Sequence, residues 1–374
     1  MKLYWKVVVG FVAASGAMAG QRLLTLGVLQ RAILVARPSA AVRSPYVADI
    51  MLLADPQIER KVLQGIGSLG TNEQSPTKTG RKKQLQECTA YLGEIAPEGS
   101  LALAHAPSLD CAGQALPGTI VLVSPNTNPQ AKTRYSIQLL ERKDERTLIG
   151  YHPSLAESIA KNILSLGILN DEFQLSSTPD ATQLSAQMRY SRSRFDFAIE
   201  TDNELLLIEV KNVVCAENDK LIDHRHALFP IGDSSRSESG AVSERAIKHV
   251  HELTHLQSTN TEDGRRIRTA VLFIVNRNDC VAFRPCHEAD LLFAQLLQRA
   301  HRNGVCLLAY QVNWSTVDNE YIASTGSVLP IAFDSEVNSD EIDEVKLGSI
   351  LSSVNEVEVE DDQLNGQGTK KRKR

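Results

Sequence analysis

Aromatic residues are scarce in this sequence, at 5% of the chain. That scarcity argues against a surface that stacks the bases of single-stranded nucleic acid on aromatic rings. The six cysteines form no CxxC pair and no cysteine–histidine repeat at zinc-finger spacing. A structural zinc domain and a disulfide framework are therefore not indicated. The apolar run 7–19 is too short to span a membrane, and no membrane partner is expected.

Most of the chain also lacks an excess of positive or negative charge. The net charge is −5, but residues 334–364 hold eleven acids and one lysine, and residues 370–374 are all basic. Residues 1–333 are therefore neutral overall, so bulk charge gives no argument for nucleic acid. The low complexity and high charge of residues 334–374 predict a disordered acidic and basic tail.

Two sequence features give competing predictions of location. The basic run 370–374 predicts import into the nucleus. Lys2 and Lys6 precede the apolar run 7–19, which ends in small residues, as in a leader for secretion or for an organelle. Residues 1–26 are therefore expected to be a leader or an extension.

Short strands dominate residues 27–150. Strand-forming runs separated by proline and glycine predict a small barrel, similar to an OB-fold. The runs are Leu29–Val35, Tyr46–Leu53, Glu87–Leu92, Leu101–His105, Thr119–Ser124 and Arg134–Leu140.

Residues 151–333 have a different pattern, in which helices alternate with strands. Apolar spacing predicts helices over 153–166, 243–256 and 288–302, and buried strands over 269–275 and 305–312. Alternating helices and strands indicate an α/β domain. The whole chain is thus expected to be a two-domain α+β/α/β protein with a charged tail.

The most informative stretch is 195–211, which reads as a hairpin whose turn is Asp202-Asn203. With that turn, Asp196 lies opposite Glu209, and Arg194 lies opposite Lys211. Two acids and a lysine on one patch suit a hard divalent cation. The alternative is a solvated, salt-bridged strand face.

A second motif favours a different class of function. Residues 251–255 read His-Glu-Leu-Thr-His, which satisfies HExxH and is found in zinc peptidases. Zinc would need a third ligand, for which the downstream candidates are His287, Glu288 and His301.

Several runs together resemble the sugar fermentation stimulation protein (SfsA) family. The second domain carries the resemblance over most of 151–333, and the first domain carries it more weakly. The runs that match are 192–197, 208–213, 216–218, Phe229-Pro230, 243–249 and 304–310.

The resemblance implies an OB-like first domain, a second domain similar to the PD-(D/E)xK nucleases, and binding to DNA. It implies that Asp196 and Glu209 hold Mg²⁺ or Mn²⁺ and that Lys211 acts as the third catalytic residue. Five residues become candidate nucleic-acid contacts: Arg192, Arg194, Arg245, Lys248 and His249.

The sequence departs from the family where a glutamate is usual before the Arg-Ser-Arg run, since Ala186 and Gln187 stand there. That departure weakens the expectation of cleavage more than that of binding. A non-catalytic DNA-binding regulatory protein is the alternative.

Overall fold

The computed structural model forms two compact units. The first contains residues up to Asn162 together with 274–279 and 310–328, and the second contains 163–273, 280–309 and the chain from 329. The sequence placed the boundary between the two domains at residue 150. In the structure the first unit extends to Asn162 and also includes the two later segments. The structure describes residues 20–42, 44–53, 101–108, 111, 113–128, 130–142, 147–175, 183–191, 193–232 and 242–353.

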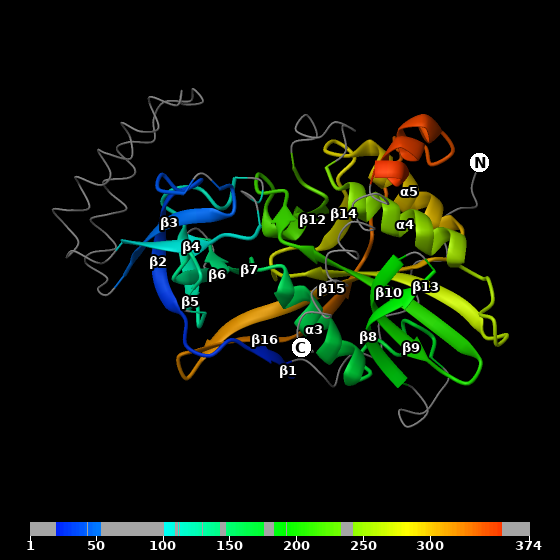
Figure 1. Ribbon diagram of the computed structural model, residues 1–374, viewed down its shortest axis with the longest axis horizontal. Coiled ribbons are helices and arrows are strands. Elements are labelled where there is room, and N and C mark those ends of the chain that lie inside the picture. Colours follow the sequence, from blue (N-terminus) through cyan, green and yellow to red (C-terminus); the bar gives the residue numbers. More distant parts are fainter. Residues whose placement is uncertain are drawn as a thin grey trace, which may run out of the picture. The chain divides into compact units, whose positions relative to one another are not determined.

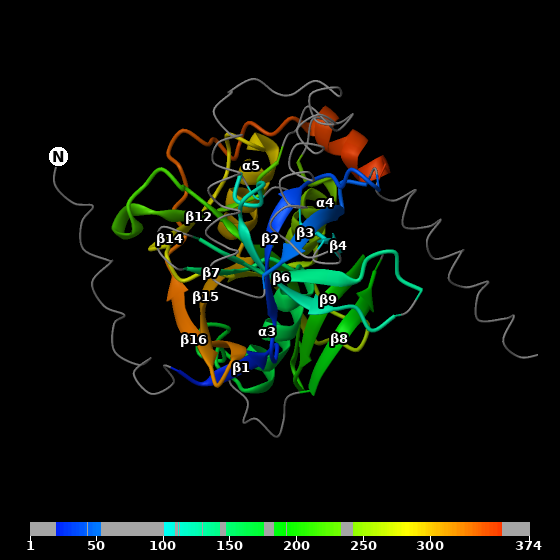
Figure 2. The same cartoon turned by 90° about the vertical axis from the view of Figure 1, so that its left-hand side faces the viewer.

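The first unit contains a closed five-stranded barrel, which confirms the prediction of a small barrel (Figure 2). Its strands run in the order β4-β3-β2-β5-β6, and a parallel pairing of β6 with β4 closes it. Apolar side chains from all sides fill the interior and are almost completely buried. The strands are β2 (Gln30–Ala36), β3 (Val47–Leu52), β4 (Leu101–His105), β5 (Ile120–Pro125), β6 (Tyr135–Glu141) and the appended β7 (Leu148–Gly150). The predicted strand 87–92 lies outside the described residues.

The first unit also contains β1 (Arg22–Thr25), which pairs antiparallel with β16 (Glu320–Leu329). Residues 22–25 are therefore part of the fold, although the sequence had assigned 1–26 to a leader or extension. Gly326 lies against its neighbouring strand so closely that a Cβ would stand 2.2 Å from the carbonyl oxygen of Gln311. Only glycine permits that approach.

A mixed sheet runs in the order β1-β16-β15-β13-β10-β9-β8. Residues 205–208 of β10 are all buried, as expected for a strand covered on both faces. The remaining strands of the sheet are β8 (Gln183–Tyr190), β9 (Ser193–Glu200), β10 (Glu204–Val213), β13 (Arg266–Val275) and β15 (Cys306–Val317).

Helices α4 (Glu244–Leu256) and α5 (Leu291–Arg302) of the second unit pack against each other (Figure 1). The Asp290 carboxylate caps α5 by accepting from the N–H of Phe293. Both helices fall within the predicted ranges, as does α3 (Ser154–Ser165), most of which belongs to the first unit. The small sheet of β11 (Cys215–Ala216), β12 (His226–Phe229) and β14 (Ala282–Pro285), and the short helix η2 (Ile222–His224), complete the elements.

Residues 334–353, here called the strap, differ from the predicted disordered tail. They form a turn and a helix at 344–353 that lies beside α5 in Figure 1. Leu347 and Ile350 are 3% and 0% exposed, and Arg299 of α5 donates to the carbonyl of Ser339 and pairs with Glu344. The many acids of this segment predicted disorder, but its few apolar residues form a buried face. Residues 354–374 lie outside the described part.

Within the described residues, no helix has both the length and the apolar character needed to cross a membrane.

Candidate metal centre

The hairpin of β9 and β10 has the register that its turn predicts. Thr201 donates its N–H to the carbonyl of Glu204 at 2.9 Å, which encloses Asp202 and Asn203 as the two-residue loop. Glu200 pairs with Leu205, and the count continues to Phe197 with Ile208. The antiparallel pairing ends there, one pair before Asp196 and Glu209.

Asp196 lies at the point where β9 and β10 stop pairing. Its carboxylate accepts a hydrogen bond from the backbone N–H of Val210 at 2.8 Å. The side chain thus takes the place of a backbone hydrogen bond between β9 and β10. This bond holds Asp196 beside the residue that follows Glu209. The two acids are therefore brought to one end of the hairpin, as the sequence predicted, although through a side-chain bond and not through regular pairing.

Glu209 is the most constrained acid of the site, at 3% exposure. Its Oε1 accepts from Lys211 Nζ at 2.5 Å and from Nδ1 of His249 on α4. Its other oxygen, Oε2, is buried and has no hydrogen-bond partner among the described residues. A buried carboxylate oxygen without a partner is costly, so it is a natural ligand for a cation.

The electrostatic surroundings keep Glu209 ionised. Burial raises its pKa. The charge of Lys211 and the hydrogen bond and charge of His249 lower the pKa by more than burial raises it, so it falls from 4.5 to about 2. An ionised carboxylate only accepts hydrogen bonds, so His249 donates from Nδ1. The site therefore presents a fixed negative charge at neutral pH.

Gln187 of β8 supplies a third oxygen-bearing side chain. Its amide nitrogen lies 3.5 Å from Asp196 Oδ1. The β8–β9 register runs through Ala186 with Phe197 and Met188 with Phe195, so Gln187 falls opposite Asp196. Gln187 has φ +55°, a left-handed conformation inside a strand, and such strain is often found at functional sites.

These side chains form a set of hard oxygen donors. Among the residues that the structure describes, no cluster of three or more acids, cysteines and histidines could hold a metal. A cation at Asp196 and Glu209 would therefore complete its shell with backbone carbonyls, water or a bound ligand. The Gln187 amide oxygen would join them if the amide turned its oxygen, in place of its nitrogen, towards Asp196. Mg²⁺, Mn²⁺ and Ca²⁺ accept such shells, so the donor set fits a hard divalent cation.

Exposed arginines lie next to these acids. Arg194 precedes Asp196 by two positions on β9 and pairs across the ladder with Arg189 of β8. Both arginines are exposed, as is Arg245 in the first turn of α4. Like charges directly opposite on a ladder repel, and an anion between them relieves that repulsion. Sequence reasoning considered only Ala186 and Gln187 on the strand before the Arg-Ser-Arg run, so it missed Arg189.

Two of the residues predicted to contact nucleic acid are almost completely buried. Lys248 and His249 are 1% and 2% exposed. His249 packs against the ring of Phe195 and hydrogen bonds to Glu209, so it positions the acid and does not reach a phosphate on the surface. Arg192 lies outside the described residues.

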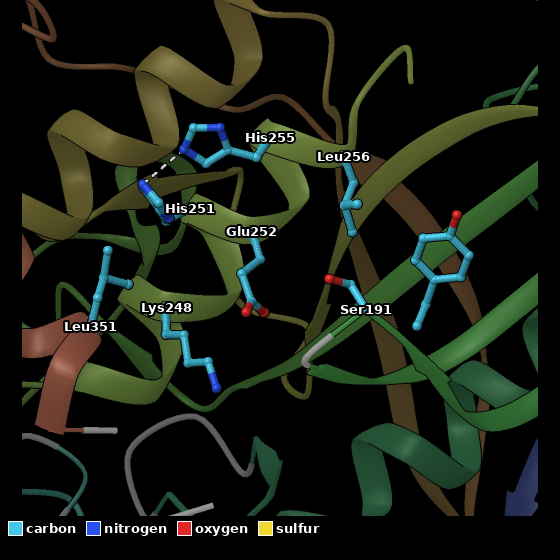
Figure 3. Close-up of a pocket in the computed structure, with 8 residues that line it drawn as sticks. Ser191, Lys248, His251, Glu252, His255, Leu256 and Leu351 are labelled. Carbon is cyan, nitrogen blue, oxygen red and sulfur yellow. Dashed lines mark hydrogen bonds between the residues drawn. The ribbon is translucent and has the colours of Figure 1, made fainter. Parts of the chain in front are cut away.

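A pocket of about 200 Å³ lies beside α4 and is also lined by Tyr190 and Ser191 at the end of β8 and by Leu351 (Figure 3). His251 and His255 of the HExxH motif meet there, with their Nε2 atoms 3.0 Å apart. Glu252 points away from them and accepts from the hydroxyl of Ser193. Within the described part of the chain, none of the predicted candidates joins the pair as the third ligand of a peptidase: His287 lies by Glu288 and Asp334, and His301 stacks on Phe333.

Comparisons with known proteins agree with this architecture. Residues 154–318 match the family model described as "Sugar fermentation stimulation protein RE domain". A sugar fermentation stimulation protein homolog of Syntrophotalea carbinolica is 32% identical over 224 residues, which cover 58% of this chain and 82% of that protein. A homolog of Maricaulis maris is 31% identical over 216 residues, covering 57% and 80%.

A solved structure gives independent support for the fold. Pyrococcus furiosus SfsA, determined in complex with Ca²⁺, superposes with a TM-score of 0.55 over 83% of this chain and 99% of that chain, at 18% identity. The fold and site thus define a two-unit protein with a closed barrel and a mixed sheet that carries an acidic hairpin. The chain belongs to the sugar fermentation stimulation protein family.

Proposed function

We propose that this protein binds DNA and holds a divalent cation, Mg²⁺ or Mn²⁺, at Asp196 and Glu209. The observation that carries the proposal is the partnerless, buried Oε2 of an ionised Glu209. Leaving a charged oxygen without a partner in the interior opposes folding, and a bound cation removes that cost. The Ca²⁺ complex of the Pyrococcus furiosus relative adds support, because Ca²⁺ prefers the same oxygen ligands.

The residues around the acids suit a phosphodiester. A divalent cation bound here would polarise a phosphoryl oxygen and lower the pKa of a bound water. Lys211 is 13% exposed at its side chain and contacts Glu209 through Nζ. From that position its ammonium group stabilises negative charge at phosphorus or orients the attacking water. His249 of α4 contacts the same carboxylate oxygen of Glu209 as Lys211 does.

The exposed arginines supply the affinity for DNA. The side chains of Arg194 and Arg245 form no hydrogen bond or ion pair with the described residues, so their guanidinium groups are available to phosphates. Arg189, opposite Arg194, adds a second cation to the same ladder position. Phosphate contacts of this kind are independent of base sequence and depend strongly on salt.

Metal binding is tested by titrating Mn²⁺ into the full chain and following bound Mn²⁺ by electron paramagnetic resonance. We expect wild type to bind Mn²⁺ and Glu209→Gln to bind at least about tenfold more weakly, since one ligand charge is lost. Glu217→Gln is the matched control, because Glu217 is an acid engaged by Arg284 and His226 elsewhere in the unit. Equal binding by wild type and Glu209→Gln would refute the site.

DNA cleavage is tested separately with plasmid and Mn²⁺, comparing wild type with Glu209→Gln. Nicking that disappears in the variant supports a nuclease. A second candidate function, DNA binding without cleavage, is favoured by the neutral amide of Gln187 beside Asp196, where an acid would complete a three-carboxylate site. A gel shift without nicking would select that candidate.

A further inference from the structure

We propose that His251 and His255 form a second cation site, separate from the hairpin acids and specific for a borderline transition metal such as Zn²⁺. The two residues lie one helical turn apart on α4 and line the pocket of Figure 3. The site does not depend on the proposed binding of DNA or of Mg²⁺.

The distance between the two rings fits two bonds to one metal. Their Nε2 atoms lie 3.0 Å apart, and both point into the same space. Zinc–nitrogen bonds of about 2.0–2.1 Å at angles between 90° and tetrahedral separate the two nitrogens by roughly 2.8–3.4 Å. The pair therefore reaches this separation with no change of backbone, because the helix already sets the spacing of the two side chains.

The protonation state favours a ligand. Burial lowers the pKa of His251, and the neighbouring His255 lowers it further, while Glu344 of the strap raises it. Arg299 of α5, which pairs with Glu344, also lowers it. A neutral imidazole is the form that binds metal. Without metal, one ring must donate its Nε2 proton to the other, and a cation replaces that single proton.

The surroundings define an open site that binds metal without peptidase chemistry. Tyr190, Ser191, Lys248, Glu252, Leu256 and Leu351 also line the pocket, which leaves room for water molecules or a small ligand. The amine of Lys248 points away from the two histidines (Figure 3). The Glu252 carboxylate is engaged by Ser193 and faces away from the histidine nitrogens. It is therefore not in position to activate a water on the metal. Imidazole ligands select Zn²⁺, Ni²⁺ or Cu²⁺ over Mg²⁺, which prefers the oxygens of the hairpin site.

The test is calorimetric titration of Zn²⁺ into the full chain at pH 7 in the presence of excess Mg²⁺. We expect wild type to bind Zn²⁺ at this site, and both His251→Gln and His255→Gln to weaken that binding by about tenfold or more, since loss of an outer partner alone costs as much. Lowering the pH to about 5 should weaken the same binding, because protons compete with the metal for imidazole nitrogen.

Matched controls separate this site from other zinc ligands. His224→Gln removes a histidine that is 74% exposed at its side chain, and it should leave Zn²⁺ binding unchanged. Glu209→Gln should also leave it unchanged, which makes the result independent of the hairpin acids. Circular dichroism of each variant checks the fold, and His255, being exposed, tolerates substitution. Zn²⁺ binding in His251→Gln and His255→Gln equal to that of wild type would overturn the proposal.

Discussion

Glu209 of β10 and His249 of α4 lie forty residues apart in the sequence and share a buried hydrogen bond. The bond fixes the orientation of the carboxylate, leaving its Oε2 atom without a partner. It also joins the hairpin to the helix that packs over it. The chemistry of the candidate metal centre and the stability of the second unit therefore depend on the same contact.

Glu209 predicts a defined dependence of stability on pH. Its folded pKa of about 2 lies below its unfolded value of 4.5, a difference worth about 3 kcal/mol. A depressed acid stabilises the fold above its unfolded pKa, and that stabilisation is lost as pH falls from about 4.5 towards 2. Urea unfolding of wild type between pH 6 and 3 measures it. Glu209→Gln should show a shallower decline, and equal slopes would contradict the assignment.

His249 predicts a loss of both stability and metal affinity. His249→Leu keeps an apolar side chain beside Phe195 but removes the donor to Glu209. A hydrogen bond to a charged group contributes about 1.5–3 kcal/mol, so the free energy of unfolding should fall by that amount. Mn²⁺ should also bind more weakly, because the carboxylate is no longer fixed. His224→Leu, at an exposed position, should change neither measurement.

Gln187 predicts a gain of function. Gln187→Glu places a third acid beside Asp196, and the added charge should strengthen Mn²⁺ binding by about tenfold or more, as ligand charge tunes such sites. Without metal the same change should lower the melting temperature, because the acids repel. Gln183→Glu, on the same strand and exposed, is the control for charge alone. Unchanged Mn²⁺ affinity in Gln187→Glu would place residue 187 outside the cation's shell.

The exposed arginines predict a change in the salt dependence of DNA binding. Each phosphate contact contributes about 0.9 to the slope of log affinity against log salt. Arg194→Ala should reduce that slope by about one, as should Arg245→Ala. Fluorescence anisotropy with a labelled duplex at several salt concentrations measures it. Lys161→Ala removes an exposed cation of α3 in the other unit and should leave the slope unchanged.

The strap predicts a large effect from a region whose composition indicated disorder. Ile350→Ala creates a cavity at a position with 0% exposure and should cost about 2–5 kcal/mol of unfolding free energy. Val345→Ala, at 86% exposure, should cost almost nothing. Chemical denaturation compares the two variants. Equal stability of both would mean that the strap is not packed against α5 in solution.

Much of the fold was accessible from the sequence because local signals were strong. The Asp202-Asn203 turn fixed the register of β9 and β10, and apolar spacing predicted α3, α4 and α5. The prediction failed where a tertiary contact decides the structure. Half of the residues of strand β8 are exposed and none is fully buried, so the strand is held by its ladder with β9. The strap contains six acids, yet its sparse apolar residues are enough to bury one face.

In the candidate site, too, the features set by local sequence were predicted and those set by tertiary contacts were not. The acids and Lys211 follow from counting back from a turn, so they were found. The role of His249 depends on how α4 packs against β10, and no local pattern distinguishes a histidine that holds an acid from one that faces a phosphate. Its position between Lys248 and Val250 on the buried face of an amphipathic helix was the available signal.

The two-residue turn at Asp202-Asn203 has a consequence for how this family member can change. Each additional residue in that loop shifts β9 against β10 by one position and turns every side chain to the opposite face. Asp196 would then be directed away from Val210 and Glu209. The length of this short loop is therefore as important to the candidate metal centre as the acids themselves, and an insertion there is expected to separate Asp196 from Glu209 while leaving both residues in the sequence.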